Sequence, residues 1–153
     1  MKDNKKRKKT VILSNGYPST GKTASTNRLY SQLLNNYRVV LLSTLSVRNS
    51  MNLMEDLHSG KMREMVYMEI VKQTEQKITE DADVIILDGN FAKRSVREKI
   101  FDIANKYGAS IFIIECTVDS EEIIKKRLEY RKKHEDDIQH RASSMDLYYL
   151  IKD

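Results

Sequence analysis

The sequence predicts an α/β domain built on a parallel β-sheet with helices on both faces. The first observation is a set of short apolar runs, each continuous and rich in β-branched residues, as expected for strands buried on both faces. These runs cover residues 11–13, 39–42, 84–87 and 111–114. The second is that helical patterns fill the intervals, and strands alternating with helices imply right-handed crossovers and a parallel sheet. The third is a glycine-rich segment between the first run and the next helical pattern, which fits a tight strand-to-helix turn.

Apolar residues at helical spacing predict the helices between these strands. Gly108 is placed to end the third helix. Asp119, with Glu122 three residues later, is typical of a capping box and predicts the start of the fourth. A last helix is expected over residues 142–151. The apolar positions that carry the four patterns are Tyr30, Leu33, Leu34 and Tyr37; Met62, Met65, Val66 and Ile70; Val96, Ile100, Ile103, Ala104 and Tyr107; and Ile123, Ile124 and Leu128.

The length and composition favour one globular domain. The chain has 153 residues, of which 40% are apolar and 32% are charged, a balance that supports a core and argues against disorder. The one cysteine, Cys116, excludes a disulfide scaffold within the chain and an all-cysteine metal site. No apolar run approaches the roughly 18 residues of a membrane span. We therefore expect a cytoplasmic protein with a reduced thiol and no membrane contact.

The first nine residues carry the net charge. They hold six basic residues against one acidic residue, which equals the net charge of +5 of the whole chain, so the remainder is formally neutral. We therefore expect residues 1–9 to form a basic, disordered tail and residues 10–153 to form the folded domain. The tail is either a solubilising arm or a weak contact for nucleic acid or other polyanions. The neutral body offers no basic surface to extend such a contact.

The strongest chemical signal fits the pattern G-x-x-x-x-G-K-[ST] and reads Gly16-Tyr17-Pro18-Ser19-Thr20-Gly21-Lys22-Thr23. Gly16 and Gly21 allow the backbone to turn successive N–H groups toward a phosphate, and the following helix adds its positive N-terminal end. Lys22 offers a cation to the β- and γ-phosphates, and Thr23 offers a hydroxyl to Mg²⁺. By chance the pattern arises in about one chain in 200 of this length. The alternative is a glycine-rich surface turn with an exposed lysine.

Asp88 directly follows the third apolar run, at the carboxyl end where parallel strands bind ligands. We expect this carboxylate to hold Mg²⁺, directly or through water, because its strand would lie beside the phosphate loop. The alternative is an aspartate that caps the next helix. Glu115, at the end of the fourth run, is a weaker candidate of the same kind.

Arg127 and Arg131 stand four residues apart on one predicted helix, so both side chains project from the same face. Guanidinium groups above a phosphoryl group neutralise the charge that develops during its transfer. The alternative is a solvated basic face, because lysines and glutamates flank both arginines. The sequence leaves the choice between a catalytic lid and a surface helix open.

Together these segments resemble the P-loop kinases, and most closely the branch of polynucleotide kinases, zeta toxins and seryl-tRNA-kinase-like proteins. The resemblance covers nearly all of residues 10–153. Besides the loop at residues 16–23, it is carried by the segment 86–91 with Arg94 and Arg97 behind it, Glu115 and Cys116, the segment 127–131 and the segment 141–148.

The resemblance implies a three-layer α/β/α P-loop NTPase fold whose short parallel sheet has four or five strands, ordered 2-3-1-4. It implies that the loop with Lys22, the acid Asp88 and the arginines Arg127 and Arg131 bind ATP with Mg²⁺ and catalyse transfer. The acceptor would be a hydroxyl on a small molecule or a nucleic-acid end. By placement and resemblance, the candidates for the acceptor pocket are Arg48, Asn90, Arg94 and Arg97.

The stretch after the second run departs from the family pattern. Relatives usually carry one or two acids there, before an arginine, and one acid acts as the base on the acceptor hydroxyl. This chain keeps the arginine but reads Ser43-Thr44-Leu45-Ser46-Val47-Arg48. General-base help is worth about 10²–10⁴-fold, whereas phosphoryl transfer depends mainly on positioning and charge stabilisation. We therefore expect an ATP-dependent kinase that acts on a hydroxyl. The alternative is a nucleotide-binding module or weak NTPase.

Two smaller departures concern the loop and the chain length. Ser19 stands where many relatives have glycine, which is tolerated if the backbone there is not left-handed. The chain is short after the fourth run, so the sheet is expected to have either four strands or also the fifth strand that relatives carry. No guanine-recognition signature is present, so ATP is the expected nucleotide.

Overall fold

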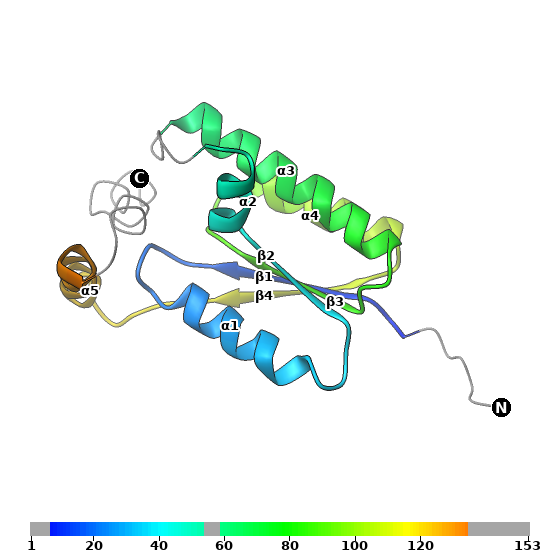
Figure 1. Ribbon diagram of the computed structural model, residues 1–153, viewed down its shortest axis with the longest axis horizontal. Helices are drawn as coiled ribbons and strands as arrows, with labels where there is room; N and C mark the ends of the chain where they lie inside the picture. The colour runs from blue at the N-terminus through cyan, green and yellow to red at the C-terminus, as the bar shows by residue number, and fades with distance from the viewer. Residues whose placement is uncertain (1–6, 54–58, 135–153) are drawn as a thin grey trace.

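A parallel sheet in the order β2-β3-β1-β4 lies at the centre of the computed structural model, which describes residues 7–53 and 59–134 (Figure 1). The strands are β1 (Thr10–Asn15), β2 (Val39–Ser43), β3 (Val84–Asp88) and β4 (Ser110–Glu115). Every neighbouring pair is parallel, and β1 pairs with both β3 and β4. The predicted α/β class and strand order are therefore confirmed.

Helices cover both faces of the sheet (Figure 1). One face carries α1 (Lys22–Leu33), and the other carries α2 (Thr44–Ser50), α3 (Gly60–Thr79) and α4 (Arg94–Lys106). α5 (Glu121–His134) follows β4 and lies beyond the ends of the strands. The helix expected over residues 142–151 lies outside the described residues. Within residues 7–53 and 59–134, no helix has the length and apolar character that a membrane crossing requires.

The core forms because alternate strand residues face opposite sides of the sheet. Val11 and Leu13 of β1 pack in the cluster that α3 and α4 cover, whereas Ile12 packs in the cluster that α1 covers. α3 contributes Val66 and Ile70, which have no exposed surface. Full burial of each such side chain stabilises the fold by about 1.5–3 kcal/mol. This packing fixes the position of β1 and β3, whose carboxyl ends carry the predicted site.

The fourth apolar run is not buried on both faces, in contrast to the expectation from its sequence. Phe112 and Ile113 of β4 are 58% and 46% exposed. The reason is that β4 lies at the edge of the sheet, where β1 is its neighbour on one side in the described part of the chain. A continuous apolar pattern therefore identified the strand correctly but not its place in the sheet.

The helix ends show how local sequence sets these elements. α4 ends at Lys106, and Gly108 follows with a φ of 63°, as predicted for a helix stop. α5 begins at Glu121 and not at the predicted Asp119, so Asp119 does not occupy the capping position. α2 was not predicted. The Ser43 hydroxyl accepts the N–H of Ser46 at 3.0 Å and caps this helix directly after β2.

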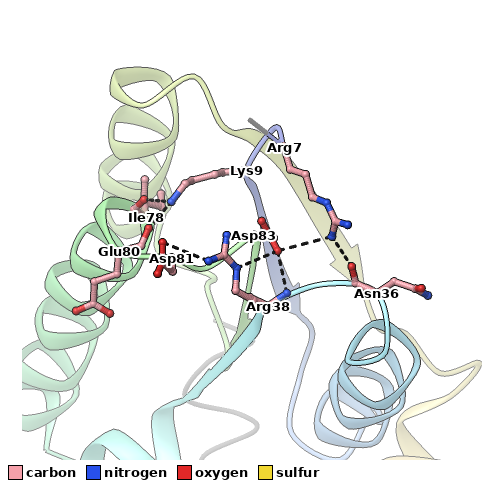
Figure 2. A network of polar contacts seen from close by, with 8 residues as sticks. All are labelled: Arg7, Lys9, Asn36, Arg38, Ile78, Glu80, Asp81 and Asp83. Carbon is pink, nitrogen blue, oxygen red and sulfur yellow. Dashed lines mark hydrogen bonds and ion pairs between the residues drawn. The ribbon is translucent and has the colours of Figure 1, made fainter. Parts of the chain in front are cut away.

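A polar network closes the end of the sheet opposite to the loop at residues 16–21 (Figure 2). Asp83 accepts the backbone N–H of Arg38 at 2.9 Å and lies 3.9 Å from the Arg7 guanidinium. Burial opposes ionisation of Asp83, but the hydrogen bonds from Arg38 and the charges of Arg38 and Arg7 outweigh it and lower the pKa of this carboxyl. The carboxylate therefore stays ionised and ties together the ends of several strands.

Lys9 joins the same network (Figure 2). Its ammonium group donates to the carbonyl oxygen of Glu80 at 2.6 Å and to that of Ile78, both near the C-terminal end of α3. Its carbonyl oxygen accepts the N–H of Ser110 at 2.9 Å. The structure thus places Arg7 and Lys9 against the domain, although we expected all of residues 1–9 to form a solvated arm. The cause is the partial negative charge at a helix C-terminus, which attracts the lysine.

Candidate functional site

The loop between β1 and α1 bends through three left-handed residues. Gly16, Ser19 and Gly21 have φ angles of 147°, 62° and 96°. A Cβ atom on Gly16 would lie 2.3 Å from the carbonyl oxygen of Cys116, so no other residue fits there without a shift. Ser19, which stands where many relatives have glycine, adopts a left-handed backbone conformation, so the serine strains the backbone at this position. This strain is of order 1–2 kcal/mol.

The N-terminus of α1 is free of side-chain caps. Gly21 occupies the capping position, and the first turn contains no acidic residue. The first N–H groups of a helix lack partners within the helix and carry partial positive charge. This end of α1 therefore has the properties of an anion site, as the sequence pattern predicted.

Lys22 folds back over the loop. Its ammonium group donates to the carbonyl oxygens of Gly16 and Tyr17, each at 2.7 Å. Burial lowers the pKa of Lys22 to about 8, with Asp88 opposing this shift and Arg131 adding to it. A partly buried cation in this position is stabilised when an anion enters the loop.

Thr23 and Asp88 meet at the carboxyl end of the sheet. The Thr23 hydroxyl donates to Asp88 Oδ2 at 2.9 Å, and Asp88 is 6% exposed. Ser14 of β1 holds the segment after β3, because its hydroxyl accepts the N–H of Gly89 at 3.1 Å. Hydroxyl and carboxylate oxygens are the ligands that Mg²⁺ prefers, so this pair fits the predicted metal position. Glu115, the weaker candidate, is exposed at the end of β4.

α5 reaches the loop through its two arginines. Arg127 donates to the carbonyl oxygen of Ser19 at 2.9 Å. Arg131 lines the cavity beside the loop and acts electrostatically on Lys22. The structure thus brings both predicted arginines to the phosphate loop, and a purely solvated face does not describe them. Whether they act in catalysis stays a prediction.

A cavity of about 600 Å³ extends from the loop to α2, α3 and the start of α4. Arg48 and Asn90 line it, as predicted for the acceptor pocket. Arg94 and Arg97 are not part of its wall. Arg94 pairs with Glu98 at 2.7 Å on the outer surface of α4, and Arg97 donates to the carbonyl oxygen of Phe91 at 2.6 Å. The register of α4 is the reason, because it turns other positions toward the cavity.

Tyr67 of α3 fixes the segment that follows Asp88. Its hydroxyl donates to the carbonyl oxygen of Asn90 at 2.6 Å and accepts the N–H of the same residue at 3.1 Å. The ring also packs edge-on against Phe91, with centroids 5.3 Å apart. Burial raises the pKa of Tyr67 to about 12, so the phenol stays protonated at neutral pH. This tyrosine positions one wall of the cavity.

Several cavity residues were missed by the sequence analysis. They come mostly from α3 and the start of α4, whose positions over the loop depend on tertiary packing. Arg63 and Tyr67 lie one helical turn apart on α3, near the buried Val66, so helical spacing was the available signal. The missed lining residues that carry charge or a hydroxyl are Arg63, Glu64, Tyr67, Lys93, Ser95 and Lys99.

Comparison with known proteins gives one family match and many similar folds. A family model described as an AAA domain matches residues 11–147. No curated protein matches the sequence closely enough to count as a relative.

The similar solved structures include nucleotide complexes. A candidate kinase from Chloroflexus aurantiacus has a TM-score of 0.72 at 19% identity, over 95% of this chain and 76% of that chain. Kti12 from Chaetomium thermophilum, in complex with ADP-AlF3, has a TM-score of 0.72 at 14% identity, over 93% of this chain and 78% of that chain. The APS kinase CysC of Mycobacterium tuberculosis, in complex with AMPPNP and APS, has a TM-score of 0.62 at 14% identity, over 84% of this chain and 70% of that chain. At these identities the likeness establishes the fold.

Proposed function

The chain belongs to this AAA-domain family, which is P-loop kinase-like, and from that membership we propose that it is an ATP-dependent phosphotransferase acting on a hydroxyl group. The single observation that carries the proposal is the loop at residues 16–23, which contains the partly buried Lys22 and leads into an uncapped helix N-terminus. The nucleotide complexes of Kti12 and CysC support ATP as the ligand.

The loop would hold the β- and γ-phosphates of ATP through backbone N–H groups and the ammonium group of Lys22. The Thr23 hydroxyl and the Asp88 carboxylate, 2.9 Å apart, would hold Mg²⁺. When bound, Mg²⁺ supplies positive charge to the phosphate oxygens. Arg127 and Arg131 reach the loop from α5 and would stabilise negative charge on the transferred group.

In the proposed reaction, the acceptor oxygen forms a bond to the γ-phosphorus while the bond from that phosphorus to the β–γ bridging oxygen breaks. ADP leaves with the electron pair of that bond. The hydroxyl proton must pass to water or to a carboxylate at the acceptor side. Cavity-lining carboxylates are Asp88, which bonds to Thr23, and Glu64 of α3. Glu64 is therefore our candidate for the base that the stretch after β2 lacks.

A second candidate function is nucleotide binding without efficient transfer. The observation that favours it is the structure of the stretch after β2. Ser46, one of the residues at the place of the expected acids, accepts the N–H of Ser43 at 3.3 Å and so completes the capping box in which Ser43 caps α2. Leu45 lines the cavity but cannot take a proton. A protein built this way would bind Mg-ATP and release it unchanged.

The first experiment measures thermal stability with and without millimolar Mg-ATP. We expect a clear rise in Tm for the native chain and none for Lys22→Met, because the loop loses its phosphate-binding cation. Lys72→Met is the matched control, since its side chain on α3 is 75% exposed and outside the phosphate loop. Absence of any shift for the native chain would refute both candidate functions.

The second experiment separates the two functions. It follows label from γ-labelled ATP into products with a panel of hydroxyl acceptors. Transfer well above ATP hydrolysis supports the kinase and excludes the binding-only module.

Asp88→Asn should weaken the Mg²⁺ dependence of nucleotide binding, and an unchanged dependence would remove Asp88 from the metal position. Glu64→Gln should lower kcat by about 10²-fold or more if this residue is the base.

A further inference from the structure

The hydroxyl group of Ser19 in the phosphate loop is buried and unpaired. Ser19 is 7% exposed, and within residues 7–53 and 59–134 its Oγ is the one buried side-chain nitrogen or oxygen that has no hydrogen-bond partner. A buried polar group without a partner destabilises the folded state, and such groups are rare in native proteins. The packing of the nucleotide-free domain therefore does not explain this hydroxyl.

The other hydroxyl groups of the same loop differ from that of Ser19, because each has a partner. Thr20 donates to the carbonyl oxygen of Tyr17 at 2.8 Å, and Thr23 donates to Asp88 at 2.9 Å. The loop and the adjacent strand end thus provide acceptors to both threonines. The unpaired hydroxyl is a particular property of Ser19 and not of the whole loop.

The backbone of Ser19 carries a second cost. Its φ of 62° lies in the left-handed region, which glycine adopts without strain and serine does not. Glycine at this position would therefore avoid both the strained backbone and the unpaired hydroxyl. Strained residues other than glycine concentrate at ligand sites, where the surrounding structure and the ligand offset their cost. Two separate observations on one residue thus point to a ligand that pairs with the hydroxyl.

The position of Ser19 indicates which part of a nucleotide this ligand is. Ser19 lines the cavity beside the loop, as Lys22 and Arg131 do. Its carbonyl oxygen accepts a hydrogen bond from Arg127 at 2.9 Å, so α5 reaches the loop at this residue (Figure 1). The two arginines of α5 are the groups that we propose to act on the transferred phosphoryl group. Ser19 therefore lies on the side of the loop where the γ-phosphate of ATP would be held.

We propose that the Ser19 hydroxyl donates a hydrogen bond to the γ-phosphate of bound ATP and thereby gives the loop a preference for ATP over ADP. A bond from a hydroxyl to an ionised phosphate oxygen is charge-assisted and stronger than a bond between neutral groups. ADP has no γ-phosphate, so the hydroxyl stays unpaired in the ADP complex. Loss of this bond after phosphoryl transfer favours release of ADP. The inference rests on the proposed function, and specifically on its nucleotide-binding step.

Calorimetric titration of the full-length chain with Mg-AMPPNP and with Mg-ADP tests the preference. Ser19→Ala should weaken AMPPNP binding about tenfold and change ADP binding by less than about twofold, because AMPPNP alone offers the acceptor. Ser31→Ala makes the same chemical change at an exposed position of α1 and should leave both affinities unchanged. An unchanged AMPPNP affinity in Ser19→Ala, or an equal loss for both nucleotides, would overturn the proposal.

A second variant, Ser19→Gly, separates the effect of the hydroxyl from that of the strained backbone. It lacks the hydroxyl, as Ser19→Ala does, but it adopts the left-handed φ without strain. We expect Ser19→Gly to show the same loss of AMPPNP affinity as Ser19→Ala. Native AMPPNP affinity in Ser19→Gly would assign the preference to the backbone and contradict the role of the hydroxyl.

Urea denaturation in nucleotide-free buffer tests the unpaired state of the hydroxyl. Ser19→Ala should unfold at a urea midpoint equal to or above that of the native chain, because the substitution removes a polar group that has no partner. A clearly lower midpoint would mean that the hydroxyl stabilises the nucleotide-free fold through a partner within the protein, and the proposal would then be wrong.

The same titrations distinguish failure of this inference from failure of the proposed function. A native chain that binds neither AMPPNP nor ADP refutes nucleotide binding, and the inference fails with it. A native chain that binds both nucleotides, with equal effects of Ser19→Ala on the two affinities, overturns this inference alone.

Discussion

Replacing Lys22 by methionine should stabilise the nucleotide-free protein. Burial lowers the pKa of this ammonium group from 10.5 to about 8, which means that the fold disfavours its charged form. At about 1.4 kcal/mol per pH unit, the charge costs the folded state about 3 kcal/mol near neutral pH. Methionine has nearly the same length and carries no charge. We therefore expect Lys22→Met to raise the free energy of unfolding by up to about 3 kcal/mol while abolishing stabilisation by Mg-ATP.

The pH dependence gives this prediction its sharpest form. The unfolded chain binds the Lys22 proton up to its ordinary pKa of 10.5, whereas the folded chain releases it near 8. Native stability therefore rises with pH across that interval, and the advantage of Lys22→Met should fall below about 1 kcal/mol near pH 10.

Urea denaturation of both proteins in nucleotide-free buffer, at several pH values, measures the difference in free energy of unfolding. Urea is preferred to guanidinium chloride because a salt would screen the charges. Lys72→Met, at a mostly exposed position on α3, should show no such trend. Equal stability of Lys22→Met and native protein near neutral pH would refute the reasoning, as would a difference that stays constant as the pH rises.

Three further substitutions test the geometry around the site and the sheet. Ser19→Gly should raise the free energy of unfolding by about 1 kcal/mol, because glycine adopts the left-handed φ of 62° without strain. Ser19→Ala keeps the strain and is the control, so equal urea midpoints for Ser19→Gly and Ser19→Ala would contradict this prediction. Tyr67→Phe should lower the free energy of unfolding by about 1–2 kcal/mol, because both backbone groups of Asn90 lose a partner; an unchanged midpoint would show that water replaces the hydroxyl. Lys9→Met should lower the free energy of unfolding, measured by urea denaturation, by about 0.5–1 kcal/mol, because Lys9 loses its hydrogen bonds at the C-terminal end of α3. Lys8→Met, at an exposed position, should leave the free energy of unfolding unchanged, and equal effects of the two substitutions would contradict this role of Lys9.

The phosphate loop shows a balance between stability and binding. We expect Lys22 and Ser19 both to destabilise the nucleotide-free protein, Lys22 through a partly buried charge and Ser19 through a left-handed backbone. Strain of this kind persists where the surrounding structure holds it and where a ligand repays it. The two residues lie in the segment that we propose to bind ATP, so their cost is consistent with a site prepared for an anion.

Much of the fold was predictable because its signals are local. Continuous apolar runs identified all four strands, and helical spacing identified the four longer helices. The loop at residues 16–23 was predictable because eight consecutive residues set both its shape and its chemistry. Asp88 was predictable for a related reason, since the carboxyl ends of parallel neighbours meet at one edge.

The assignments that failed depend on packing between distant segments. Arg94 and Arg97 were placed in the acceptor pocket by placement and resemblance, but neither lines the cavity: Arg94 pairs with Glu98, and Arg97 bonds to the backbone carbonyl of Phe91. Arg63 and Tyr67 reach the cavity because α3 packs over the end of β3. That packing is not encoded near Asp88.

The sequence by itself therefore determined the α/β class, the strands and the phosphate loop, because each depends on residues close together in the chain. The tertiary structure decided which strand lies at an exposed edge, that Lys9 holds the end of α3, and which basic residues surround the cavity. Those features arise when helices far apart in sequence pack against one sheet, since packing fixes the rotation of each helix and hence the direction of its side chains.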